Sequence, residues 1–295
     1  MKCKKMTVLE LKNINYTYGK DTPFEKKALD NVSLSIKSGA VTGIIGHTGS
    51  GKSTLVQVMV GLLKQDEGTF LFEGNDVWEN PKKPTGVRFN IGLVMQYPEY
   101  QLFDETVISD IGFAPRNMGL DENEINERVK EAALYTGLGD DILFKSPFEL
   151  SGGQKRRAAI AGVIAMRPKV LVLDEPAAGL DPKGRTEILG GLRTYCDRMG
   201  ASVVIVSHSM EDIARYCDNI IVMNKGRVAL EGTTEEVFSH TDVLHLCGLK
   251  VPNITNICSL LREGGMPIDK TVLTIEQARE IILDLIQKKK EDTNA

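Results

Sequence analysis

The chain has 295 residues, 42% hydrophobic and 26% charged, which is ordinary for a soluble globular protein with one large domain or two smaller ones. Its 36 basic and 40 acidic residues leave a net charge of −4, which argues against a basic nucleic-acid binder. The five scattered cysteines lack a CxxC pair and indicate a reduced, cytosolic chain, and no apolar run approaches the ~20 residues that span a bilayer. Any membrane role is therefore expected to come through a partner.

The first part of the chain has the pattern of short strands that lead into a helix. Residues 7–45 carry alternating apolar and polar side chains with turn residues between them, which is typical of antiparallel strands. Residues 41–46, VTGIIG, predict a buried strand, and 53–63 predict the helix that follows it. Residues 90–96 predict another strand, and 121–134 predict a helix with its apolar residues on one face.

Two continuous apolar runs dominate the middle of the chain. The runs at 169–174 and 201–207 are typical of parallel strands that are covered on both faces. A helix is predicted between them, starting at Asp181 and Pro182, because aspartate is a good N-cap and proline suits the first helical position. The order strand, loop, helix, strand predicts an α/β fold with a parallel core sheet.

The C-terminal part predicts a hairpin followed by helices. Residues 219–232 predict two strands that turn at Asn224–Gly226, and beyond about residue 238 the pattern is helical and polar. The last strong element is an amphipathic helix over 274–287. We therefore expect one domain over 1–238 and a small helical extension over 239–295.

A glycine-rich loop lies between the strand at 41–46 and the helix that follows. Its sequence fits G-x-x-x-x-G-K-[ST], the pattern in which backbone N–H groups surround phosphate oxygens at a helix N-terminus. Lys52 is expected to reach the outer phosphates and the Ser53 hydroxyl to bind Mg²⁺. The predicted ATP-binding residues of this loop are Gly46, His47, Thr48, Gly49, Ser50, Gly51, Lys52, Ser53 and Thr54.

The strand at 169–174 ends in two acidic residues. Asp174 has the position of an aspartate that holds Mg²⁺, and Glu175 could polarise a water molecule near the γ-phosphate. Taken alone, two acids at a strand end could equally be solvated or cap a helix. His208 could likewise cap a helix, and Gln96 could cap a strand.

A second glycine pair follows Ser151 in the sequence LSGGQ at 150–154. Serine before a helix, followed by glycines that allow close backbone approach, forms a second candidate receptor for an anion. A surface serine–glycine turn is the alternative. The residues concerned are Ser151, Gly152, Gly153 and Gln154.

The order of these motifs resembles the ATP-binding cassette ATPases over residues 7–238. The resemblance implies that Glu175 is the catalytic base and that His208 contacts the γ-phosphate. It also implies that Tyr18 stacks on adenine and that Gln96 touches Mg²⁺ and relays to a membrane partner. Two chains would pair head to tail, with Asp181 at their seam, and each LSGGQ segment would cover the ATP held by the other chain.

A narrower resemblance links the chain to the ATPase (A) component of energy-coupling factor transporters, of the second type. It rests on the sequence at 96–120, on ELSGGQKRRAAIAGVIAMRP and on EPAAGLDPKGR. Within 96–120, Tyr97, Tyr100, Leu102 and Phe103 form an apolar cluster that suggests a docking surface, with local packing as the alternative. The segment GLKVPNITNICSLLREGG also resembles this group, in which a C-terminal extension helps to pair two ATPases.

These resemblances imply an ATP-hydrolysing subunit, peripheral on the cytoplasmic side of the cell membrane, that powers uptake of vitamins or metal ions. The expected partners are a second, different A chain, a membrane coupling (T) subunit near Tyr97–Phe103 and a substrate-binding membrane (S) subunit, without nucleic acid. The expected ligands are ATP and Mg²⁺, and the expected helical subdomain covers about 97–168. The alternatives are a cassette ATPase that acts on nucleic acid or ribosomes, and a nucleotide-binding regulator without turnover.

Overall fold

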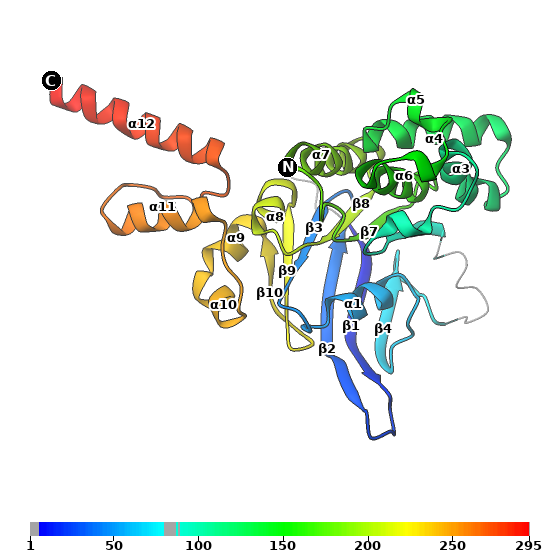
Figure 1. The fold of residues 1–295 in the computed structure, drawn as a ribbon. Helices are drawn as coiled ribbons and strands as arrows, with labels where there is room; N and C mark the ends of the chain where they lie inside the picture. Colours follow the sequence, from blue (N-terminus) through cyan, green and yellow to red (C-terminus); the bar gives the residue numbers. More distant parts are fainter. Residues whose placement is uncertain (1–5, 80–86, 88, 295) are drawn as a thin grey trace.

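A computed structural model of the protein describes residues 6–79, 87 and 89–294, with side chains up to residue 287 (Figure 1). The N-terminal part forms a four-stranded sheet in the order β2-β1-β4-β5, and all its pairings are antiparallel, as predicted. Its strands are β1 (Thr7–Tyr18), β2 (Lys26–Lys37), β4 (Glu67–Phe72) and β5 (Asn75–Asp76).

The second sheet is the parallel core that the apolar runs predicted. Its order is β10-β9-β3-β8-β7-β6, in which only the β10–β9 hairpin is antiparallel. Every residue of β3 and β8 is buried, because this sheet is covered on both faces. The six strands are β3 (Val41–Ile45), β6 (Ile91–Val94), β7 (Val170–Asp174), β8 (Ser202–Val206), β9 (Asn219–Asn224) and β10 (Arg227–Thr233).

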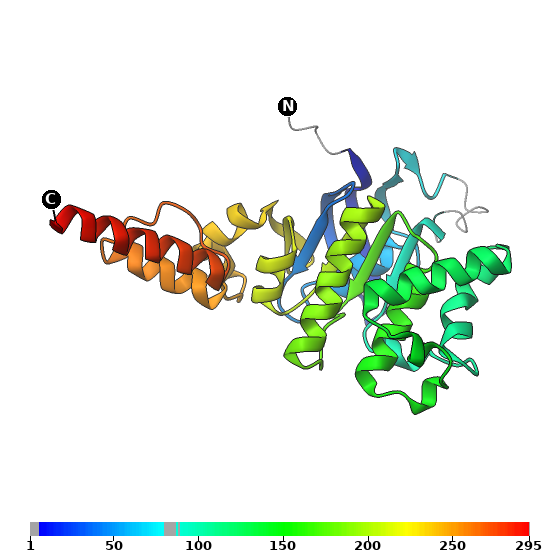
Figure 2. The same ribbon diagram turned by 90° about the horizontal axis from the view of Figure 1, so that it is seen from above.

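Helices form a layer at one end of the core sheet and along it (Figures 1 and 2). The short helix α1 follows β3 and packs into the core between the two sheets, whereas the other cassette helices belong to a separate, larger core. These elements are α1 (Lys52–Met59), η1 (Pro98–Gln101), α3 (Val107–Asn117), α4 (Glu122–Thr136), α5 (Asp140–Leu143), η2 (Pro147–Glu149), α6 (Gly152–Ile164), α7 (Pro182–Met199) and α8 (Met210–Tyr216). This arrangement confirms the predicted cassette fold with a parallel core sheet, an antiparallel β subdomain and a helical part.

The C-terminal helices are α9 (Thr234–Ser239), α10 (Thr241–Leu246), α11 (Asn253–Glu263) and α12 (Ile275–Asn294). In Figures 1 and 2 the pair α11 and α12 projects from the rest of the chain, and it has a small core of its own around Cys258, Val272 and Ala278. Phe238 and Leu244 instead pack into the main core. The domain boundary near residue 238 and the role of 239–295 stay predictions.

Cys3 lies outside the described residues, and Cys196, Cys217, Cys247 and Cys258 are all buried.

Two adjacent glycines of α7 should respond oppositely to alanine. A Cβ atom at Gly191 would overlap the backbone carbonyl of Tyr135 in α4, whereas a Cβ at Gly190 would meet no atom within 4 Å. We expect Gly191→Ala to lower the free energy of unfolding by about 2–3 kcal/mol through overpacking. The control Gly190→Ala should raise it by up to about 1 kcal/mol through helix propensity. Urea unfolding of both variants tests this, and equal effects would contradict the close approach of α4 and α7.

Candidate nucleotide-binding site

The phosphate loop joins the buried strand β3 to the N-terminus of α1. Lys52, the first residue of α1, curls back so that its Nζ donates to the carbonyl oxygens of Gly46 (2.7 Å) and His47 (3.0 Å). Burial lowers the pKa of the Lys52 amine, although Asp174 and Glu175 oppose this shift. The loop therefore holds a cation at its centre, beside the free N–H groups of a helix start.

The hairpin turn between β9 and β10 packs against this loop. Gly226 N donates to the carbonyl of Ser50 (2.9 Å), and the His47 Nε2 atom lies 3.1 Å from Asn224 Oδ1. A Cβ at Gly51 would lie 2.7 Å from the carbonyl oxygen of Ala28 in β2, so only glycine allows this close approach. The loop is thus held between the two sheets.

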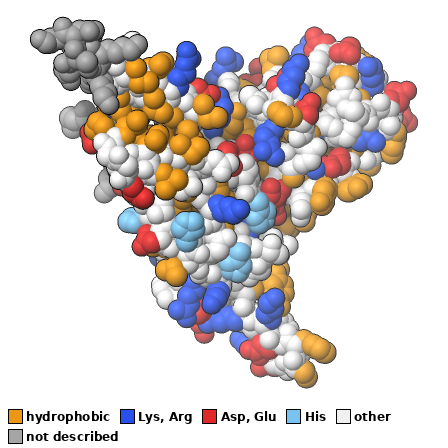
Figure 3. Space-filling model, turned by 60° about the vertical axis from the view of Figure 1, so that its left-hand side comes forward, with side chains coloured by type: hydrophobic (Ala, Val, Ile, Leu, Met, Phe, Trp, Pro, Cys, Tyr) orange, Lys and Arg blue, Asp and Glu red, His pale blue; other side chains and the backbone are white. Residues whose placement is uncertain are grey.

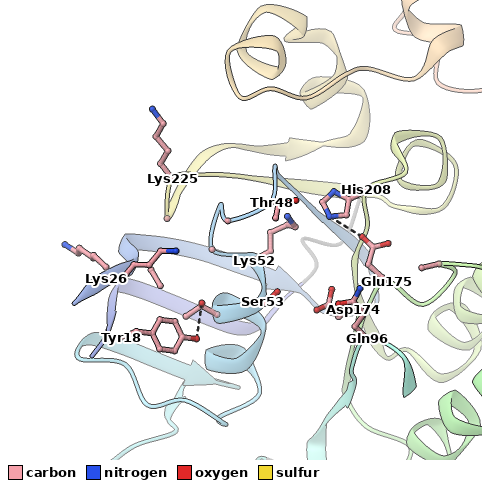
Figure 4. A pocket seen from close by; sticks show the side chains of 17 residues that line it. Tyr18, Lys26, Thr48, Lys52, Ser53, Gln96, Asp174, Glu175, His208 and Lys225 are labelled. Atoms are coloured by element: carbon pink, nitrogen blue, oxygen red, sulfur yellow. Dashed lines mark hydrogen bonds and ion pairs between the residues drawn. The ribbon is translucent and has the colours of Figure 1, made fainter. Parts of the chain in front are cut away.

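The acidic residues lie at the end of β7, where the core sheet meets the phosphate loop. Burial raises the pKa of both carboxyls, Asp174 and Glu175, and the charge of Lys52 partly offsets this shift. Glu175 has a left-handed backbone (φ 53°), and its Oε1 atom is buried 3.7 Å from His208 Nε2 without a hydrogen bond from the described residues (Figure 4). Burial also lowers the pKa of His208. A buried carboxylate with an unused acceptor suits a general base.

A cavity of about 790 Å³ brings these groups together (Figure 4). Tyr18 lies at its wall, 40% exposed, with its hydroxyl 3.2 Å from Thr54 Oγ1, which suits a ring that packs on a base. The predicted residues on the wall are Tyr18, Thr48, Gly49, Gly51, Lys52, Ser53, Thr54, Gln96, Asp174, Glu175 and His208. Gly46, His47 and Ser50, which were also predicted, do not line this cavity.

Sequence reasoning missed other residues on this wall. They come from the β1–β2 hairpin, from the β9–β10 turn and from the segment after Glu175, and they are Lys26, Lys27, Ala28, Ala178, Lys225 and Gly226. The lysines are recognisable as basic residues in the sequence, but no local signal places them near a nucleotide.

The donor set of this cavity fits a magnesium ion. Ser53, Gln96 and Asp174 offer a hydroxyl, an amide oxygen and a carboxylate, and Mg²⁺ prefers a few such oxygen ligands completed by phosphates and water. The described residues contain no cluster of three or more His, Cys, Asp or Glu side chains that could hold a metal by themselves. A metal here would therefore depend on the nucleotide for much of its coordination.

A second cavity, of about 510 Å³, surrounds the other glycine pair, and the described residues that line it differ from all of those that line the first. Ser151 caps α6: its Oγ accepts from Gln154 N (3.3 Å), and Gln154 Oε1 accepts from Ser151 N (3.0 Å). Asp181 caps α7 in the same cavity by accepting from Gly184 N (2.7 Å). The wall includes Ser151, Gly153, Gln154 and Asp181, whereas Gly152 is exposed beside it.

The apolar cluster after Gln96 lies mostly on the surface. Tyr97, Tyr100 and Phe103 are 51%, 85% and 61% exposed, while Leu102 packs against the main core. Phe103 also stacks edge-on against Phe113 of α3, with ring centroids 5.0 Å apart. Local packing thus explains Leu102 but leaves three aromatic rings in contact with solvent.

A phosphate loop beside two carboxylates at the end of a parallel strand defines a nucleotide-hydrolysing P-loop cassette. The sequence model of the ABC transporter family matches residues 29–178. The energy-coupling factor transporter ATP-binding protein EcfA2 of Caldanaerobacter subterraneus subsp. tengcongensis is 51% identical over 275 residues, covering 93% of this chain and 96% of that protein. EcfA2 of Clostridium acetobutylicum is 51% identical over 283 residues, covering 96% and 99%.

Solved structures agree with these relatives. The cbiO1 protein of Clostridium perfringens, part of the ABC transporter complex cbiONQ, is 40% identical with a TM-score of 0.73, covering 86% of this chain and 99% of that one. The ATP-binding cassette MJ0796, solved as a dimer bound to ADP and phosphate, is 30% identical with a TM-score of 0.69, covering 77% and 98%. This chain therefore belongs to the ABC transporter family, as an ATP-binding protein of energy-coupling factor transporters. It binds ATP and is an ATPase coupled to transport.

Among the described residues, no helix combines the length and the apolar character that crossing a membrane requires.

Proposed function

We propose that this chain binds Mg²⁺-ATP in the cavity around Lys52 and hydrolyses it only when paired head to tail with a second ATP-binding subunit. The observation that carries this proposal is the separation of the two cavities: the phosphate loop and Glu175 line one, and Ser151 and Asp181 line the other. Each cavity offers half of a nucleotide site, since the first supplies the cation and the base and the second supplies the N-terminus of α6 with its Ser151 cap.

In this arrangement Ser53, Gln96 and Asp174 would hold a magnesium ion, which would supply positive charge against the outer phosphates. Lys52 donates to the same phosphates, and Glu175 accepts a proton from the attacking water. His208, beside Glu175 Oε1, contacts the γ-phosphate. Tyr18 supports the adenine ring at the other end of the cavity.

The C-terminal helices are proposed to strengthen the pairing of two ATPase subunits. Figure 3 shows hydrophobic side chains gathered beside the end of the C-terminal helices. The exposed apolar residues of α11 and α12 are Ile257, Leu260, Ile275, Leu283 and Ile286, each at least 45% exposed. An apolar surface of this kind favours association with another protein. The pair is proposed to consist of two different A chains.

The complete complex is proposed to include a membrane coupling (T) subunit that docks near Tyr97–Phe103 and a membrane subunit that binds the transported substrate. Together they would import vitamins or metal ions, with this chain peripheral on the cytoplasmic side of the membrane. The test is reconstitution: the purified chain, its partner ATPase and the membrane subunits are assembled in vesicles. ATP-dependent uptake is then measured, and co-purifying nucleic acid without a membrane partner would contradict this assignment.

Removing the exposed aromatic rings should uncouple transport from ATP binding. The triple variant Tyr97→Ala, Tyr100→Ala and Phe103→Ala removes three side chains that are at least half exposed, so the fold should tolerate it. If these rings anchor a membrane subunit, recovery of the complex should fall at least about tenfold, because buried aromatic anchors contribute ~2 kcal/mol or more. ATP affinity of the isolated chain should persist.

The matched control is Phe24→Ala, which removes a ring that is 87% exposed on the turn between β1 and β2. It should leave both assembly and uptake at the level of the unmodified chain. If assembly and uptake were unchanged in the triple variant, the three rings would not anchor a membrane subunit and would be ordinary surface residues.

A further inference from the structure

Arg156 is a buried arginine in α6 whose guanidinium contacts two segments far away in the sequence. Arg156 as a whole is 4% exposed. Its Nε and terminal nitrogen donate to the two carboxylate oxygens of Glu99, at 3.1 and 2.9 Å, and its other terminal nitrogen donates to the carbonyl oxygen of Ala178. The guanidinium also lies 5.9 Å from the ring centroid of Tyr97. Each of the three nitrogens of this planar group therefore donates to a protein acceptor.

The two segments that Arg156 joins both have a part in the proposed function. Glu99 belongs to η1, which contains Tyr100 and has Tyr97 as its N-cap, and both rings are part of the proposed docking site. Ala178 lies on the wall of the nucleotide cavity, and its N–H donates to the carbonyl of Glu175 (3.2 Å). Glu175, the proposed base, is the first residue of this turn and has a left-handed backbone. One guanidinium thus connects the docking segment to the turn that holds the base.

The chemistry of the guanidinium makes the connection between Glu99 and Ala178 resistant to rearrangement. A buried guanidinium is costly unless it is paired, so displacing Glu99 without Arg156 would leave a charge without a partner. Its donors form a rigid fork that binds a carboxylate with two parallel bonds, which a lysine ammonium cannot reproduce. A shift of η1 is therefore expected to move Arg156 and, with it, the carbonyl of Ala178.

We propose that Arg156 is a positioning residue that transmits the state of the docking segment, through Glu99 and the Ala178 carbonyl, to the turn that holds Glu175. This inference rests on the proposed docking of a membrane subunit at Tyr97–Phe103. It assigns to Glu99 and Arg156 the coupling between that partner and the rate of hydrolysis. Neither Glu99 nor Arg156 is among the residues that line the nucleotide cavity.

The test compares the ATPase pair alone with the complete complex in lipid nanodiscs. The measured quantity is the ratio of the two hydrolysis rates, with ATP affinity, the yield of assembled complex and the melting temperature recorded beside it. Glu99→Gln breaks the charge pair but keeps the bond from Arg156 to Ala178. Arg156→Lys keeps the charge but removes the fork. Both variants should change the ratio by about three- to thirtyfold, the range of coupling lost along such contacts.

Arg128→Gln is the matched control. Arg128 also binds one carboxylate, that of Glu124 (3.1 and 2.6 Å), and one backbone carbonyl, that of Met166 (3.2 Å). It contacts neither η1 nor the turn after Glu175 in these bonds. The control should therefore lower thermal stability as the Arg156 variant does while it keeps the ratio of rates.

Three results would overturn the inference while the proposed function stands: an unchanged ratio in both variants, an equal change in the Arg128 control, or a change that follows only from poorer assembly. If the unmodified complex neither assembles nor responds to its membrane subunits, the proposed function fails, and this inference fails with it.

Discussion

Glu175→Gln should lower ATP hydrolysis at the site of this chain by about 10²–10⁴-fold, the usual contribution of a positioned general base. The substitution keeps the size of the side chain and leaves Lys52 and Ser53 in place, so the affinity for Mg²⁺-ATP should stay close to that of the unmodified chain. Single-turnover hydrolysis and equilibrium nucleotide binding, measured on the paired ATPases, would separate the two effects. Near-normal hydrolysis would mean that another group is the base.

The same experiment has a pH dependence with a definite sign. Burial raises the pKa of Glu175, and a base acts only when it is deprotonated. On acidification, hydrolysis by the unmodified chain should therefore fall at a higher pH than an ordinary glutamate would cause. The residual activity of Glu175→Gln should lack this step. Glu131→Gln is the control, since this half-buried carboxylate in α4 lines neither cavity and binds Arg167 instead.

Ser151→Arg in this chain should disable the ATP held by the partner subunit and spare the ATP held at Lys52. The arginine places bulk and charge at the helix start where phosphate oxygens are proposed to lie, so closure over the partner's nucleotide should fail. Hydrolysis of that nucleotide should drop by about 10²-fold or more, as misplacement of reacting groups typically does. Photo-crosslinking of labelled ATP to each chain would tell the two sites apart.

Two further variants make this result specific. Ser151→Ala removes only the cap of α6, which typically costs about 1 kcal/mol of stability. It therefore shows how much of the lost hydrolysis in Ser151→Arg comes from losing the helix cap alone. Lys52→Ala in this chain should abolish ATP at its own loop while the partner still binds. If Ser151→Arg instead disabled the nucleotide on this same chain, the head-to-tail arrangement would be wrong.

Several features of the molecule followed from the sequence because the signals that produce them are local. The buried run VTGIIG, the glycine loop and Lys52 are neighbours in the chain, so strand, loop and helix follow from a few consecutive residues. The caps at Ser151 and Asp181 depend on atoms three residues away, and the turn at Asn224–Gly226 depends on glycine tolerating a positive φ. Because these interactions are short-range in the sequence, they specify each element independently of where it lies in the fold.

Only the tertiary structure decided which of these elements meet. β3 pairs with β8 and β9, more than 150 residues further along the chain, and this pairing brings Asn224 to His47 and Lys225 to the nucleotide cavity. The contact between Glu99 and Arg156 spans 57 residues. No local pattern encodes contacts of this kind, because they result from burying the apolar faces of strands and helices against one another. The same packing holds Ser151 in a cavity apart from Lys52, which is the separation that the proposed pairing of two half-sites requires.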